Sequence, residues 1–475
     1  MYYKQKECMK LYFVKFFSWY ILFSLTVLHF TYAQQPLLLS DAVHTGLNNF
    51  QAIKAKQHFL NASNYLLQNV KNDYLPNVVA SVQQNYGTIN GLYGPAAPYG
   101  TLGVSSSGPV FNSQEWNAAF GSIYLVSTNW EAFTFGRKQS RISAFYAQVQ
   151  TDSADVEQEK FILSVKVAGA YFNLLAAQGL LNEAQANVNR ADTFRNVVMV
   201  RTLNGLNPGV DSSIANSELA NARLLLIDAI SNKQQAESVL GQLLVQTPVS
   251  YQLDTTFFSN IPSSFASTFN PINNPQIKYF NTKIHQSEKQ TVAIQKSILP
   301  GINLFGIFQT RGSGFGTQYN ASLPGNYSKN YFDGITPLRS NYIAGISLAF
   351  NIMSISKIKQ QINAQKEITE AYKQEYNQTF TQLENSLLLA DERIQNTLQS
   401  FYEVPIQLKA ARDAFLQKKV LYENGLATII DLQQALYIVN RAETSAKLAG
   451  INVWQSLLLK VAASGDWDLL WQQIK

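Results

Sequence analysis

Two aspartates stand in the same short context, and they are the first candidates for chemistry in this chain. Residues 204–211 read NGLNPGVD and residues 424–431 read NGLATIID, so Asp211 and Asp431 each lie five positions after a leucine. An Asn-Gly pair predicts the end of a helix. Each aspartate is then expected in the first turns of the returning helix, where the helix dipole favours an anion. Helix capping explains such an aspartate as well as an electrostatic function does.

No other residues have the spacing of a catalytic or metal site. The histidines His44, His58 and His285 lack the spacing to a carboxylate or a second histidine that a metal site needs. No glycine-rich phosphate loop follows a predicted strand. Charge runs such as residues 391–393 are typical of a solvated helix face. We therefore predict that the protein is not an enzyme and has no metal or other cofactor.

The two aspartates recur because the chain is duplicated. Leu-Pro at 75–76 is matched by Leu-Pro at 299–300, and residues 129–144 align with residues 349–364 at the offset of the two Asn-Gly turns. Landmarks that recur in one order at nearly one offset indicate two copies of one unit. The predicted organisation is a signal peptide (1–33), a first repeat (34–246), a linker (247–271), a second repeat (272–465) and a C-terminal tail (466–475).

Within each copy, the hydrophobic pattern predicts the order helix, strand, loop, strand, long helix, turn, helix. In the first copy these are a helix over 38–73, strands near 77–88 and 117–130, a long helix over 137–203 and a helix over 212–246. A helix over 137–203 would be about 100 Å long, far longer than a globular core needs. The second copy follows the same plan, with Pro405 as an expected kink.

The N-terminal segment and the composition indicate export. Four lysines precede an apolar run over 16–30, which is typical of a secretory signal peptide. Cys8 is the only cysteine and lies in this segment, so the exported chain has no thiol. The formal charge of +6 is not gathered into a basic stripe, which argues against a nucleic-acid partner. These features fit the bacterial envelope.

The predicted strands suit a membrane. Residues 342–350 alternate between an apolar face and a small one, and strands of about ten residues are long enough to cross a bilayer when tilted. An open sheet of only four strands cannot lie in lipid with bare edges. Either the sheet is soluble or several chains close one barrel together, and we favour the shared barrel. The apolar run over 161–181 could itself cross a membrane, but we expect a packed helix because Lys166 interrupts it.

The chain resembles the TolC-like outer-membrane efflux family. The stretches that carry the resemblance are NWEAFTFGR (129–137), VAGAYFNLLAAQ (167–178), YENGLATIIDLQQA (422–435) and LLLKVAASGDW (457–467). The resemblance implies an α+β membrane protein in the bacterial outer membrane that extends into the periplasm. It also implies a homotrimer whose long helical hairpins form a trimeric α-barrel, with four strands per protomer in a shared 12-stranded β-barrel.

The resemblance also implies partners and sites. The partners would be a periplasmic adaptor (membrane fusion protein), an inner-membrane RND or ABC transporter, and outer-membrane lipid. The tips that contact the adaptor would be Gly205, Leu206, Gly425 and Leu426, and the periplasmic constriction would contain Asp211, Tyr422, Asp431 and Gln434. Ala427 and Gln434 depart from members that carry an arginine and a second aspartate there. We therefore expect a gate held by helix packing more than by an ion pair, with a weaker cation preference.

The expected function is an exit duct for small toxic compounds. Protein export by a type I secretion system and metal-ion efflux are alternatives with the same fold. A trimeric coiled-coil surface adhesin is an alternative of a different class.

Overall fold

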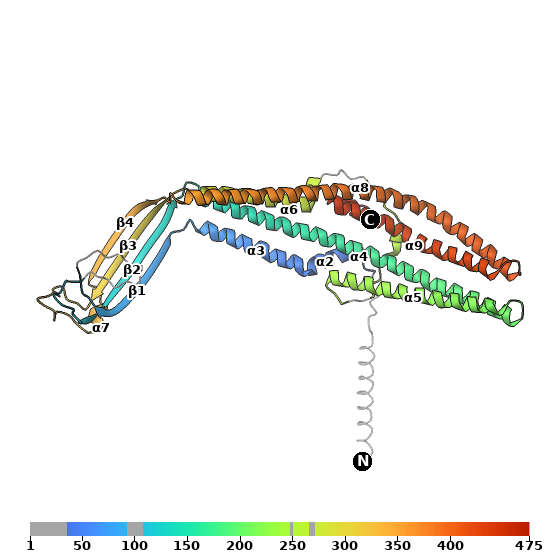
Figure 1. Ribbon diagram of the computed structural model, residues 1–475, viewed down its shortest axis with the longest axis horizontal. Helices are drawn as coiled ribbons and strands as arrows, with labels where there is room; N and C mark the ends of the chain where they lie inside the picture. Colours follow the sequence, from blue (N-terminus) through green and yellow to red (C-terminus); the bar gives the residue numbers. More distant parts are fainter. Residues whose placement is uncertain (1–35, 93–107, 248–249, 266–270, 475) are drawn as a thin grey trace, which may run out of the picture. The chain divides into compact units, whose positions relative to one another are not determined.

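The computed structural model describes residues 36–92, 108–247, 250–265 and 271–474 (Figure 1). The predicted signal peptide lies outside these ranges. The chain forms two compact units. Of the residues that the structure describes, the helical unit comprises those within 1–51, 160–270 and 384–475, and the strand unit those within 52–159 and 271–383.

The strand unit contains a four-stranded antiparallel sheet in the order β1-β2-β3-β4. Aromatic and β-branched residues alternate with small and polar ones along these strands, as expected for a half-buried sheet. The strands are β1 (Asn77–Thr88), β2 (Ala118–Phe133), β3 (Gly301–Ser313) and β4 (Arg339–Ala349). They match the segments in which strands were expected. Their register places Val126 opposite Phe308, and Phe308 opposite Tyr342.

The helices of the strand unit continue the strands (Figure 1). They are α3 (Gln51–Asn72), the first part of α4 (Arg137–Leu203), α6 (Pro275–Lys296), the first part of α8 (Ser354–Glu423) and the short α7 (Tyr331–Ile335). Proline follows α3 and α6 within a few residues, which ends both helices before the strands begin. Lys56 of α3 pairs with Asp155 of α4 at 2.6 Å. The hydroxyls of Ser287 and Thr369 join α6 to α8 at 2.8 Å.

The helical unit consists of two helical hairpins with their turns at the same end (Figure 1). Its elements are α2 (Leu39–Asn49), the second parts of α4 and α8, α5 (Gly209–Leu244), the 3-10 turn η1 (Thr255–Phe258), α9 (Ile429–Ser464) and α10 (Asp468–Trp471). Helix α8 runs through Pro405, where a kink was expected, and stays continuous to Glu423.

Aromatic side chains form the centre of the helical unit. Phe257 of η1 packs against Phe172 of α4 and Trp454 of α9, with ring centroids 5.4 and 5.0 Å apart. The Trp454 indole donates to the carbonyl of Asn260 over 2.8 Å. The part of the segment between the repeats around Phe257 and Asn260 is therefore packed into the core.

The helix expected over 38–73 is divided into α2 and α3 at Phe50. The backbone of Phe50 is extended, with φ −65° and ψ 122°, although its N–H still bonds to Gly46 over 3.0 Å. The neighbouring Asn49 turns its side-chain amide to the carbonyl of Leu244, 3.4 Å away on α5. Asparagine competes with the helix for backbone partners, which gives a physical reason for the break.

Within the described residues, α4 is the one helix long and apolar enough to cross a membrane by length and composition. Of its most apolar window, 56% is buried inside the protein. Leu163, Val167 and Leu175 are all buried. This burial agrees with the expectation of a packed helix.

Candidate functional site

The two hairpin tips of the helical unit have the same backbone geometry. Gly205 and Leu206 donate their N–H groups to carbonyls in the last turn of α4 over 3.0 and 2.9 Å, and Gly425 and Leu426 repeat this in α8 over 3.0 and 2.8 Å. Both glycines are left-handed, with φ of 69° and 75°. This pair of bonds is the Schellman motif, which satisfies the last carbonyls of a helix. Leu206 and Leu426 are 66% and 75% exposed, so each tip presents an apolar side chain.

A polar network joins the two tips. The Asn207 amide nitrogen donates to the Asp211 carboxylate over 2.7 Å and to the Tyr422 hydroxyl over 2.8 Å. The Asn207 carbonyl accepts from Arg201 Nε over 2.9 Å. Arg201 also donates to the backbone carbonyl of Glu423 over 2.6 Å, and its guanidinium lies 5.6 Å from the centre of the Tyr422 ring. The first hairpin therefore holds the end of α8 through one asparagine and one arginine.

Tyr422 lies inside the protein rather than on its surface. It is 2% exposed, and burial, followed by the negative charge of Asp211, raises the pKa of its hydroxyl. The phenol therefore stays neutral at physiological pH and serves as a hydrogen-bonding group. Apolar side chains from the other three helices of the two hairpins surround it, namely Phe194, Val198, Ala215, Ile429 and Leu432.

The two repeated aspartates have different surroundings. Asp211 is buried at 8% exposed and bonds to the Asn207 amide. Asp431 is partly exposed and forms a capping box with Thr428, whose hydroxyl lies 2.7 Å from its carboxylate. Lys418 of α8 pairs with Asp431 at 3.2 Å. The hydrogen bonds from Thr428, and then Lys418, lower the pKa of Asp431 to about 2.

The tips thus bring together most of the residues that the sequence singled out. Gln434 is exposed on α9, two turns from the tip. Sequence reasoning missed Arg201, Asn207 and Lys418. When the two repeats are aligned at their offset, Arg201 corresponds to Leu421 and Asn207 corresponds to Ala427. A polar residue in the first copy thus takes the place of an apolar residue in the second. That asymmetry was a signal for a contact between the copies.

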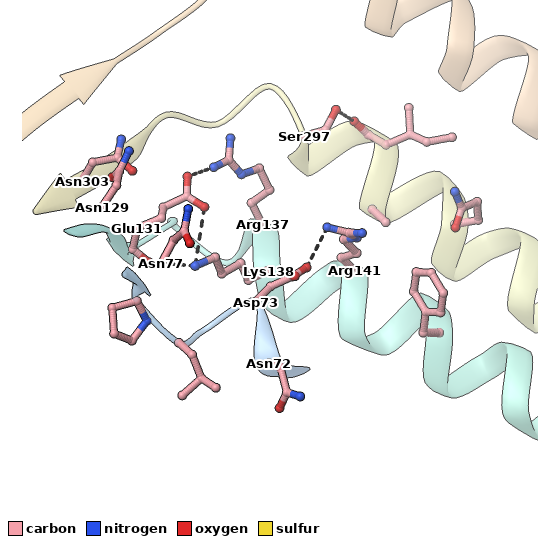
Figure 2. A pocket seen from close by; sticks show the side chains of 16 residues that line it. Asn72, Asp73, Asn77, Asn129, Glu131, Arg137, Lys138, Arg141, Ser297 and Asn303 are labelled. Carbon is pink, nitrogen blue, oxygen red and sulfur yellow. Dashed lines mark hydrogen bonds and ion pairs between the residues drawn. The ribbon is translucent and has the colours of Figure 1, made fainter. Parts of the chain in front are cut away.

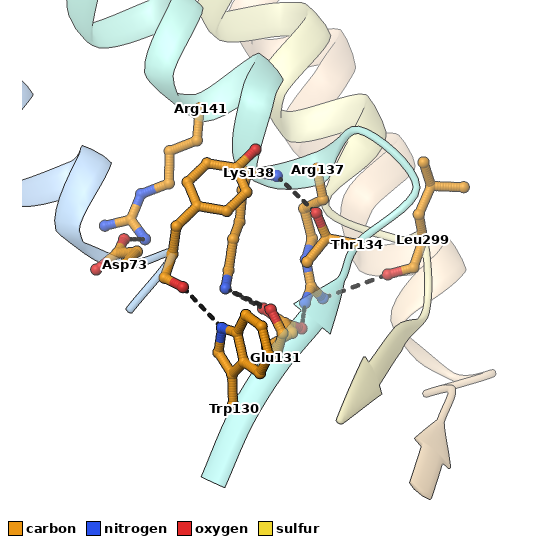
Figure 3. Close-up of polar contacts among 9 residues, drawn as sticks. Asp73, Trp130, Glu131, Thr134, Arg137, Lys138, Arg141 and Leu299 are labelled. Atoms are coloured by element: carbon orange, nitrogen blue, oxygen red, sulfur yellow. Dashed lines mark hydrogen bonds and ion pairs between the residues drawn. The ribbon is translucent and has the colours of Figure 1, made fainter. Parts of the chain in front are cut away.

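A second polar cluster lies where β2 passes into α4 (Figure 3). The Glu131 carboxylate pairs with the Arg137 guanidinium and lies 3.6 Å from the Lys138 ammonium. Arg137 also donates to the carbonyl of Leu299 over 3.3 Å, which ties this junction to the start of β3. Burial lowers the pKa of Lys138, against the opposing effect of Asp73. The cluster fixes the angle at which strand becomes helix.

An open hollow of about 950 Å³ borders this cluster (Figure 2). Its lining includes Asn77, Asn129 and Asn303 from the ends of three strands. Its charges pair with one another, as Arg141 does with Asp73 at 2.8 Å. No group of three or more His, Cys, Asp or Glu side chains in the described ranges is placed to hold a metal. The hollow is open and has a largely polar lining, and it shows no feature of a catalytic or metal site.

The sheet has two chemically different faces. Residues directly opposite in an antiparallel register share a face. What we call the apolar face contains Val78, Val82, Val126, Leu304, Phe308 and Ile346. The other, polar face contains Asn77, Ser81, Ser127, Asn303, Gln309 and Asn341, although Ile and Leu interrupt it.

Aromatic side chains mark both ends of the apolar face. Trp130 and Phe133 lie at the end near the helices, and Tyr86, Phe120 and Tyr124 lie at the end near the loops. An apolar band flanked by aromatic girdles is typical of an outer-membrane β-barrel. The apolar face therefore fits lipid, and the polar face fits a water-filled interior.

Comparison with known proteins relates this architecture to outer-membrane channels. Residues 124–245 match the family model described as outer membrane efflux protein. The outer-membrane channel OprN is 17% identical, with a TM-score of 0.70 over 90% of this chain and 89% of that chain. The CmeC channel of Campylobacter jejuni is 14% identical, with a TM-score of 0.71 over 90% and 85%. VceC of Vibrio cholerae is 14% identical, with a TM-score of 0.70 over 90% and 96%.

A search of curated protein sequences found no significant match. The structural likeness confirms the predicted fold class, with long helical hairpins and four antiparallel strands per chain. The match of the family model to residues 124–245 confirms the resemblance over that part of the chain.

Proposed function

We propose that this TolC-like outer-membrane efflux protein is the exit duct of a tripartite efflux system. In this proposal it passes small toxic compounds from the periplasm to the exterior while an inner-membrane transporter of the RND or ABC class supplies the energy. The chain itself performs no chemistry on the compounds.

The observation that carries the proposal is a sheet of four strands with one apolar and one polar face. Among the described residues, no strand pairs with the outer edges of β1 and β4. Unpaired backbone groups are costly in lipid, so the edges need partners. Three copies that pair β4 of one with β1 of the next would close a 12-stranded barrel, with the polar faces lining the duct.

The tips support docking of a periplasmic adaptor. Leu206 and Leu426 are exposed at the ends of rigid Schellman turns, so two apolar side chains per protomer project in fixed positions. Exposed apolar side chains on a pre-organised turn are suited to a protein partner because little ordering is required on binding.

The network between the tips supports a gate. In the proposed resting state Arg201 and Asn207 hold the α8 end against the first hairpin, and Asp431 is held by Lys418. An adaptor that binds better to the separated tips would shift the population toward an open entrance. Because Asp211 is buried and Asp431 is paired with Lys418, the entrance would have only a weak cation preference.

Conductance of the purified protein in planar bilayers tests the proposal. We expect small closed-state currents that rise when the tips are loosened by Asn207→Ala combined with Tyr422→Phe. A protein that assembles as a trimer but never conducts, even with these changes, would overturn the duct and favour the adhesin.

A second experiment tests the docking tips. Leu206→Asp with Leu426→Asp should abolish in vivo cross-linking of the tips to a periplasmic adaptor and leave bilayer conductance unchanged. Undiminished cross-linking would overturn the assignment of the tips.

A further inference from the structure

The charged residues of the four strands all lie on one face. Within the strands as described there are three, Glu131 on β2, Arg311 on β3 and Arg339 on β4. Glu131 is opposite Asn303 on the polar face, and Arg311 and Arg339 are directly opposite each other on that same face. Glu131 is at the helix end and has cationic partners, whereas the two arginines are at the loop end.

The two arginines face each other without an acid between them. Like charges directly opposite in a sheet repel each other, so neighbouring strands normally avoid this arrangement. In the described part of the chain neither guanidinium has an ion pair, and both residues are exposed. The flanking loop carboxylates have other partners, since Asp333 accepts from Ser328 over 2.6 Å and Glu115 from Asn117 over 3.5 Å.

The loop segment nearest this end leaves the polar face open. Helix α7 and its flanks pack on the apolar face, where the carbonyl of Ile335 accepts from Ser122 and Tyr124 over 3.1 and 3.0 Å. The Tyr331 hydroxyl donates to Gln84 on the same face over 2.7 Å. The arginine pair is therefore not covered by this segment.

We propose that Arg311 and Arg339 form an anion-binding ring just inside the outer mouth of the duct. This inference rests on the proposed trimeric duct, in which two arginines per protomer give six guanidinium groups at one level of the barrel. Guanidinium groups bind carboxylate and phosphate through paired N–H donors. A ring of fixed charge in a pore concentrates ions of the opposite sign. Compounds with carboxylate or phosphate groups are the chemical class that the ring favours at the exit.

Binding of inositol hexakisphosphate to the purified trimer tests the ring directly. We expect measurable binding at low salt that weakens as salt rises, because the screening length falls from about 10 Å at 0.1 M to 3 Å at 1 M. Arg311→Gln with Arg339→Gln should weaken binding by roughly tenfold or more, and Arg311→Lys with Arg339→Lys, which keeps the charge but loses the paired donors, should give an intermediate affinity. Lys329→Gln, which removes a positive charge from the adjoining loop, is the matched control and should leave binding unchanged.

Ion flow gives the functional readout. Inositol hexakisphosphate added on the loop side of a bilayer should block the wild-type channel, and the double glutamine variant should resist this block. Equal binding by the wild type and the double glutamine variant, or equal loss in Lys329→Gln, would overturn the ring. A trimer that binds the anion but does not conduct would instead contradict the duct and leave the ring intact. A channel that conducts without selective binding would contradict only the ring.

Discussion

The side-chain amide of Asn207 has three polar neighbours, and they come from three different helices. Arg201 belongs to α4, Asp211 to α5 and Tyr422 to α8. The amide oxygen accepts one hydrogen bond and the amide nitrogen donates two. Removal of this one side chain therefore leaves a buried carboxylate and a buried phenol with fewer partners. Each unsatisfied buried group costs about 1–3 kcal/mol.

Asn207→Ala should therefore loosen the contact between the tips. We expect a larger open fraction of the channel because the α8 end loses its hydrogen bond to the first hairpin. Single-channel recordings in planar bilayers measure this fraction. Asn216→Ala removes an exposed asparagine of α5 that bonds only to Arg195, and it is the matched control. Equal open fractions in the two variants would argue against Asn207 as the link.

The lowered pKa of Asp431 leads to a prediction about how conductance depends on pH. Its folded pKa of about 2 lies below the ordinary value of 3.8, so its stabilising contribution is present above about pH 4 and is lost as pH falls through 2. The difference in conductance between wild type and Asp431→Asn should thus be the same at pH 7 and pH 5. It should shrink below about pH 4. Asp413→Asn, at an exposed position of α8, controls for the loss of a charge. If the difference in conductance between wild type and Asp431→Asn vanishes between pH 7 and pH 5, the pKa of this carboxyl group is higher than about 2.

At this scale the sequence predicts residue types better than contacts. The Asn-Gly-Leu pattern was enough to locate both turns and both aspartates, because left-handed turn chemistry is local. It did not reveal that Asp211 is buried and Asp431 is paired with Lys418, since those differences depend on residues from other helices. Asn207 differs from its counterpart Ala427 in the second copy, but the sequence does not say which groups its amide contacts.

The linker between the repeats is held in a cradle made by two helix glycines. A Cβ at Gly450 of α9 would lie 2.5 Å from the Phe258 carbonyl oxygen, and a Cβ at Gly179 of α4 would lie 2.8 Å from the Phe258 ring. Contacts shorter than 3.0 Å are essentially never made by real Cβ atoms. These two helices therefore approach the linker closely because they have no side chain at these positions.

Gly450→Ala should displace the linker and lower the free energy of unfolding by about 1–3 kcal/mol. The backbone oxygen of Phe258 cannot move without shifting Phe257, which packs against Phe172 and Trp454. Faster chymotrypsin cleavage between 250 and 262, together with a lower melting temperature, measures the effect. Gly169→Ala is the control, because its Cβ would make an ordinary 3.7 Å contact with Leu458. If Gly450→Ala resists chymotrypsin as well as Gly169→Ala does, the close approach of α9 to the linker does not depend on this glycine.

Long elements were predictable because their patterns are long. The 67 residues of α4 contain no proline and repeat an apolar stripe, so both of its ends could be placed from the sequence. The single extended residue at Phe50 could not, since it depends on Asn49 reaching the carbonyl of Leu244 on another helix. The packing of the linker likewise depends on glycines that have no signature within their own helices.

For the whole molecule, the two faces of the sheet determine which side would meet lipid in the proposed barrel. Register alone gathers most of the apolar residues on one face, although Val79, Phe305 and Ile343 lie on the other, and it places every charged strand residue on the polar face. The sequence could suggest a shared barrel from the number of strands. It could not assign the polar face, because that assignment needs the register of all four strands at once.

Adjacent residues of β4 give a matched test of this assignment. Ile346 is opposite Leu304 on the apolar face, and Ser347 is opposite Asn303 on the polar face, near Glu131. An arginine on the lipid face of a barrel costs about 2–4 kcal/mol at the bilayer midplane and less near its edges, whereas the interior accepts charge. Ile346→Arg should therefore reduce the yield of heat-resistant trimer in the outer-membrane fraction, and Ser347→Arg should not. Because the two positions are consecutive on one strand and receive the same residue, the opposite order of yields would mean that the faces are reversed.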